Sequence, residues 1–107
     1  MSTAPKAEIL NLAGMVNYQT GSVVSRQITK ADAGNVTLFA FDAGQELSEH
    51  TAPFDALVHV VEGEAEIIIS GKSFPLKAGE AVIMPADEPH AVKATTQFKM
   101  LLTMIRA

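Results

Sequence analysis

The chain has no cysteine, few basic residues and no long apolar run, and each absence excludes a class of function. Without cysteine there is no disulfide, no thiolate metal site and no cysteine nucleophile. Eight Lys and Arg residues are outnumbered by twelve Asp and Glu, whereas a nucleic-acid partner requires clustered positive charge. Apolar runs such as residues 100–105 are far shorter than the roughly 20 residues of a membrane helix. We therefore expect neither a nucleic acid nor a membrane as a partner.

The remaining bulk properties are those of one small globular domain. The N-terminal residues 1–8 lack a basic region followed by an apolar core, so no secretory signal is expected and the protein is predicted to be soluble and cytoplasmic. A chain of 107 residues has room for a single core. Hydrophobic residues make up 48% of the chain and charged residues 19%, which leaves apolar surface for a partner subunit. We expect a homodimer.

Turn residues recur at regular intervals from residue 21 onward, and this spacing predicts an all-β fold. Intervals of about eight to ten residues between turns, with β-branched and aromatic residues in between, are typical of a sandwich or barrel. Helical periodicity is hard to find in this part of the chain. The turn positions are Gly21, Gly34, Gly44, Pro53, Gly63, Gly71, Gly79 and residues 85–89.

Five strands are predicted from pattern alone. Alternation is clearest at 64–69, where Ala65, Ile67 and Ile69 share one face. The short apolar run at 81–84 predicts a strand buried on both sides, and the last strand has two largely apolar faces, one of which can meet a partner subunit. Residues 1–8 are expected to form a loose arm, and residues 9–18 fit either a short helix or an irregular strand. The predicted strands are 22–28, 36–41, 64–69, 81–84 and 97–105.

Two segments carry glycine and histidine at spacings that resemble the signatures of one known family. The first segment, 44–63, contains Gly44, His50 and Gly63; the second, 79–94, contains Gly79, Pro85 and His90. These positions resemble the paired signatures of the cupin family. The resemblance implies a jelly-roll barrel, also called a double-stranded β-helix, over residues 21–107. Residues 1–20 are then an N-terminal arm or a segment that packs in a dimer.

Four positions depart from the family pattern. Ala52 and Ala56 stand where the first cupin signature has its second histidine and its glutamate, and Asp87 and Ala94 stand where the second has glycine and asparagine. In cupins the histidines and the glutamate converge on a divalent metal such as Mn, Fe, Ni, Cu or Zn. Only His50 and His90 remain here. The resemblance therefore implies a metal site that is weak or absent, because ligand number decides whether an ion is held.

Asp55 and His59 are the additional candidate metal ligands. Asp55 would reach the site only through a bulge, and strand alternation puts His59 on the face opposite the pocket, where a packed or interface histidine is the simpler interpretation. The same alternation places Glu46, Ser48, His50 and Ala52 on one face. The methionines Met84, Met100 and Met104 are expected to fill the core.

The predicted function is the binding of a small molecule. Alanines in place of His and Glu leave an apolar pocket with two imidazoles, which suits a small apolar or aromatic ligand with one polar end. Three alternatives stay open: a metal-dependent enzyme of the dioxygenase or isomerase type, a metal-free enzyme with His50 or His90 as acid or base, and a structural or regulatory dimer. Whether the chain is an enzyme is left open by the sequence.

Overall fold

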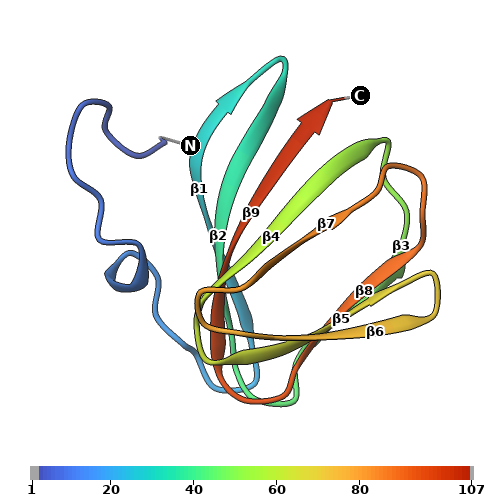
Figure 1. Ribbon diagram of the computed structural model, residues 1–107. Helices are drawn as coiled ribbons and strands as arrows, with labels where there is room; N and C mark the ends of the chain where they lie inside the picture. The colour runs from blue at the N-terminus through green and yellow to red at the C-terminus, as the bar shows by residue number, and fades with distance from the viewer. Residues whose placement is uncertain (1–2, 107) are drawn as a thin grey trace.

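The computed structural model describes residues 3–106 and consists of two antiparallel β-sheets (Figure 1). Among these residues no helix is long or apolar enough to span a membrane. A short 3-10 turn, η1 (Leu12–Gly14), precedes the sheets. The strands are β1 (Val23–Ala31), β2 (Gly34–Phe41), β3 (Glu46–His50), β4 (Phe54–Glu62), β5 (Glu64–Ile69), β6 (Lys72–Lys77), β7 (Ala81–Met84), β8 (His90–Ala94) and β9 (Phe98–Arg106).

The two sheets form the layers of a jelly roll, which confirms the predicted fold class. The first sheet has the order β1-β2-β9-β4-β7 and the second β3-β8-β5-β6. The main core lies between them, because the inward residues of both sheets belong to one buried cluster. Phe41 and Phe98 stack with ring centroids 4.5 Å apart and fill part of this core. Further along β9, the inward side chains Met100, Leu102 and Met104 line a cavity.

The predicted strands are all present. Glu64–Ile69 and Ala81–Met84 have the predicted bounds, while β1 and β2 extend into the predicted turn and leave only Asp32 and Ala33 between them. The turn after β5 is the expected tight one, since Ser70 and Gly71 both have positive φ, 49° and 80°. Two successive residues of this kind form the hairpin turn that matches strand twist.

The prediction that residues 81–84 are buried on both sides is wrong. Val82 and Met84 pack inward, but Ile83 is 62% exposed. The reason is that no described residue covers the outer face of the first sheet at this point, where Leu57 of the neighbouring strand β4 is exposed as well. The apolar run thus marks an edge strand with one uncovered side, a difference that pattern alone does not reveal.

The N-terminal segment, residues 3–20, lies outside the first sheet beside β1 and β2 (Figure 1). Ala4 and Val16 are buried in a second cluster with residues of the sheet, and the Ala4 N–H donates to the carbonyl of Ile28. The segment covers one part of the outer face and leaves Leu57 and Ile105 exposed with Ile83. The homodimer stays a prediction that this uncovered apolar area supports.

A buried lysine anchors the N-terminal segment, a contact that the sequence pattern does not predict. Lys99, on the outward face of β9, is 7% exposed. Its Nζ donates to the carbonyl of Ala13 and lies 3.7 Å from Glu62 Oε2. The Tyr18 hydroxyl donates to the same carboxylate; burial, and then this hydrogen bond, raise the pKa of Tyr18. The buried charge is thus paired with a carboxylate and hydrogen-bonded to a carbonyl, as buried charges require.

The position of Gly63, in the turn between β4 and β5, has no room for a side chain, and a substitution can test this. A Cβ at this position would lie 2.1 Å from the Gln97 carbonyl oxygen, and φ is +78°. We predict that Gly63→Ala lowers the free energy of unfolding by at least about 3 kcal/mol, measured by urea denaturation. The matched control is Gly44→Ala, at φ +83° with open space around it, for which only about 1–2 kcal/mol should be lost. Equal losses in the two variants would contradict the steric argument.

Candidate functional site

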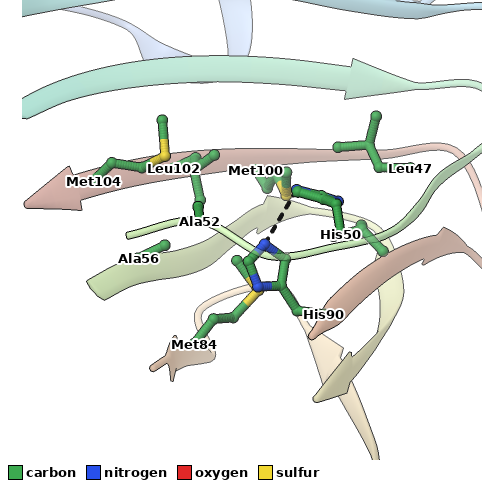
Figure 2. Close-up of a pocket in the computed structure, with 10 residues that line it drawn as sticks. Leu47, His50, Ala52, Ala56, Met84, His90, Met100, Leu102 and Met104 are labelled. Carbon is green, nitrogen blue, oxygen red and sulfur yellow. Dashed lines mark hydrogen bonds between the residues drawn. The ribbon is translucent and has the colours of Figure 1, made fainter. Parts of the chain in front are cut away.

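The fold brings His50 and His90 together from distant parts of the chain. They lie on the neighbouring strands β3 and β8, where they pair directly in the ladder. Their Nε2 atoms are 3.1 Å apart, and the rings meet nearly edge to face with centroids 4.4 Å apart (Figure 2). The pairing that the family resemblance implied for these two residues is therefore present in the structure.

A bulge in β3 decides which residues accompany His50. Between the pairs Leu47↔Val92 and His50↔His90, β3 advances by three residues and β8 by two. The extra residue breaks strict alternation, so Leu47 and His50 both line the cavity, whereas Glu46 and Ser48 do not. The prediction that Glu46 and Ser48 share a face with His50 is therefore wrong. Ala52, the fourth residue of that predicted face, does line the cavity.

Backbone carbonyls fix the orientation of both imidazole rings. His50 Nδ1 lies 2.7 Å from the carbonyl oxygen of Ser48, and His90 Nδ1 lies 3.2 Å from that of Glu88. A carbonyl only accepts hydrogen bonds, so each Nδ1 carries a proton and donates. In the neutral rings each Nε2 then presents a lone pair. The contact between the two Nε2 atoms is then a hydrogen bond only when one ring carries a second proton. In the neutral pair the two lone pairs face each other, where they can accept a ligand hydrogen or a cation.

The two histidines differ in exposure. His90 is 5% exposed, whereas His50 lies at the surface. Burial is the main cause that lowers the pKa of His90 below its ordinary value, and the neighbouring His50 lowers this pKa further, because two positive rings in contact repel each other. His90 is thereby held neutral, as an acceptor in the wall of the cavity.

The histidine pair stands at one side of an apolar cavity of about 50 Å³ (Figure 2). Ala52 and Ala56, the two positions where this chain lacks a ligand of the family signature, both face this cavity. Met84 and Met100 belong to the buried core, as expected, and Met104 packs against that core. All three methionines also line the cavity. The lining residues are Leu47, His50, Ala52, Ala56, Met84, His90, Val92, Met100, Leu102 and Met104.

Three of the lining residues were not predicted from the sequence. Leu102 alternates with the methionines of β9, and strand alternation would have found it. Val92 follows His90 by two residues in β8, and strand alternation from His90 would have found it. Leu47 is different, since it reaches the cavity only because of the bulge in β3. Nothing in the residues 46–50 marks the position of that bulge.

The structure does not bring Asp55 or His59 into the cavity. His59 follows the inward residue Val58 in β4 and pairs with Ala81 and Leu101. The Asp55 carboxylate instead accepts a hydrogen bond of 2.9 Å from the N–H of Ala86. Among residues 3–106, no three His, Asp or Glu side chains gather as a metal-binding group.

Asp87 occupies a backbone conformation that suits the glycine of the family signature. Its φ is +65°, in the left-handed region that favours glycine and that aspartate enters more readily than most residues. The departure from glycine at this position therefore leaves the turn between β7 and β8 intact.

Because its pKa is lowered, His90 should take up a proton at a lower pH than an ordinary histidine. In NMR spectra the His90 Hε1 signal should titrate with a midpoint below the ordinary 6.5. In His50→Ala the midpoint should rise but stay below that value, because burial remains. Below about pH 6.5 the unfolded chain binds this proton more readily than the native protein, so stability falls as the pH drops toward the native pKa and then levels off. A midpoint at or above 6.5 in the wild type would refute the assignment.

Comparison with known proteins places the chain in one family. A profile of the cupin domain matches residues 37–106. The structure of a conserved protein of unknown function from Streptococcus pyogenes is similar, with 33% identity over 100% of this chain and 96% of that one and a TM-score of 0.91. A cupin 2 conserved barrel domain protein from Leptotrichia buccalis is 42% identical over 91% of this chain and 47% of that one, with a TM-score of 0.88.

One relative carries a functional name. A protein from Streptomyces cyaneus called polyketide synthase CurC is 36% identical over 61 residues, which are 56% of this chain. The match spans only 40% of the length of that protein. The profile match and the full-length structural likeness agree with the two signature segments and with the jelly roll. The chain belongs to the cupin family.

Proposed function

We propose that the protein binds a small, largely apolar organic molecule inside the barrel, with His50 and His90 at the polar end of the ligand. The observation that carries this proposal is the lining of the cavity, in which the two imidazoles are the only polar side chains among the ten described residues that form it. Apolar walls with a few convergent polar groups are typical of sites for small ligands.

The protonation of the two imidazoles determines which kind of polar group the ligand can carry. Both Nδ1 atoms donate to backbone carbonyls, so the neutral pair offers acceptors only. The matching ligand group is a hydrogen-bond donor, and an O–H group such as that of a phenol, an enol or an alcohol fits. The lowered pKa of His90 keeps this acceptor in place at neutral pH.

The size of the cavity also limits the ligand. A cavity of roughly 150 Å³ is known to hold benzene, and about 50 Å³ is present here. A ligand with an aromatic ring therefore requires Met84, Met100 or Met104 to adopt other rotamers. Methionine side chains are unbranched and adapt readily, so the three of them form a wall that can yield. The likeness to a protein named polyketide synthase supports an organic ligand of this oxygen-bearing type.

A divalent metal fits the histidine pair in part. The 3.1 Å between the Nε2 atoms is compatible with two imidazole nitrogens binding one divalent ion at about 2.1 Å each. His50 and His90 would hold the ion, which would supply a Lewis acid for an oxygen of the ligand. With only two protein donors the affinity should be low. A metal-dependent enzyme of the dioxygenase or isomerase type is the alternative function.

Metal content distinguishes the two functions. Protein purified without added metal should contain far less than one transition-metal ion per chain by elemental analysis. The double variant Ala52→His/Ala56→Glu completes the ligand set at positions that face the cavity, and Ni²⁺ should bind it at least about tenfold more tightly than the wild type, measured by calorimetry. Adding His90→Ala should remove this gain. A stoichiometric ion in the wild type that survives dialysis against a chelator would favour the enzyme instead.

A pair of probes of equal shape tests the ligand proposal. Phenol and toluene differ by a hydroxyl in place of a methyl group, and both should shift the NMR signals of the methionine methyls that line the cavity. The ratio of phenol affinity to toluene affinity should fall at least about threefold in His90→Leu, because one hydrogen bond contributes about 0.5–1.5 kcal/mol. An unchanged ratio, or shifts confined to methionines outside the cavity, would refute the role of His90.

A further inference from the structure

Two chain crossovers lie side by side at the histidine end of the cavity. Residues 51–53 lead from β3 in the second sheet to β4 in the first, and residues 85–89 lead from β7 in the first sheet to β8 in the second. His50 immediately precedes the first crossover, and His90 immediately follows the second. A contact that holds the two crossovers together therefore also affects the distance between the two imidazole rings.

Two hydrogen bonds hold the second crossover in place, one to the first crossover and one to the start of β4. The N–H of Asp87 donates to the carbonyl of Ala52 over 2.8 Å, and the N–H of Ala86 donates to Asp55 Oδ1 over 2.9 Å. The first bond is between backbone groups, whereas the second depends on one side chain. Asp55 is adjacent to Ala56, whose side chain faces the cavity, so its own carboxylate turns away from the cavity and reaches the second crossover from outside.

The second crossover also sets the state of the His90 ring. Its Glu88 carbonyl accepts the hydrogen of His90 Nδ1, and this bond leaves Nε2 free to face His50. The end of the crossover next to His90 is bound independently, since the Pro89 carbonyl accepts from the N–H of Ser70. A displacement of residues 86–88 would move the Glu88 carbonyl and release the ring, while His50 keeps its own bond to Ser48.

We infer that Asp55 is a positioning residue of the histidine site. Its carboxylate holds the 85–89 crossover against the start of β4, and through the Glu88 carbonyl it fixes the tautomer of His90 and the approach of the two Nε2 atoms. This role is distinct from that of a metal ligand, because the carboxylate oxygen bonds a backbone N–H outside the cavity. The inference deepens the proposed function and rests on it where ligand affinity is concerned.

Two substitutions of Asp55 separate position from charge. Asp55→Asn loses the negative charge but keeps an oxygen that accepts from Ala86, whereas Asp55→Ala loses both. Glu49→Ala provides a matched charge control, since Glu49 is an exposed carboxylate next to His50 in sequence. In metal-free protein, ¹⁵N spectra of the imidazoles should show the Nδ1–H tautomer of His90 in the wild type, in Asp55→Asn and in Glu49→Ala. In Asp55→Ala this tautomer should lose population, and exchange of the Ala86 amide should accelerate.

Ni²⁺ titration provides the second readout, with the metal alone as probe. Loss of an outer residue that orients a ligand lowers metal affinity about 10- to 100-fold, and a drop of this size is expected for Asp55→Ala only. Equal weakening in Asp55→Asn and Asp55→Ala would mean that charge acts and position does not, which overturns the inference. An unchanged His90 tautomer in Asp55→Ala overturns it as well. If the wild type binds neither Ni²⁺ nor phenol, the proposed function fails, and the tautomer and exchange measurements still decide the role of Asp55.

Discussion

The pairing of β3 with β8 is the constraint on which the candidate site depends. These strands come from the two signature segments, and their hydrogen bonds place His50 opposite His90. The register includes a bulge, without which a different residue of β3 would face the cavity. Ring orientation follows from the same backbone, because each imidazole donates to a carbonyl two residues earlier. The geometry of the site is thus mainly a property of the main chain.

Much of the barrel could be predicted from the sequence, because its strands obey simple patterns. Glu64–Ile69 alternates and is bounded by Gly63 and by the turn at Gly71, and the structure has this strand with the predicted ends. Predictions failed where a neighbour decides the outcome. Ile83 belongs to an apolar run, yet it is exposed because nothing in the described residues covers the outer face of the first sheet there. Lysine is ordinarily a surface residue, yet the N-terminal segment buries Lys99.

The candidate site was predictable in its main residues and not in its details. Spacing and resemblance were enough to single out His50 and His90, and to single out Ala52 and Ala56 as positions that lack a ligand. The bulge that admits Leu47 depends on pairing with β8, which residues 46–50 alone do not specify. The bond from Asp55 to Ala86 joins parts of the chain 31 residues apart, and no local pattern predicts such a contact.

The methionines of the cavity have a consequence for redox chemistry. Thioethers oxidise to sulfoxides, which are polar and change the shape of an apolar wall. Met84, Met100 and Met104 line the same cavity as the imidazole pair, so reactive oxygen species generated at an iron or copper ion there would arise next to oxidisable sulfur. Oxidation of these methionines would therefore change both the polarity and the shape of the wall that the proposed ligand meets.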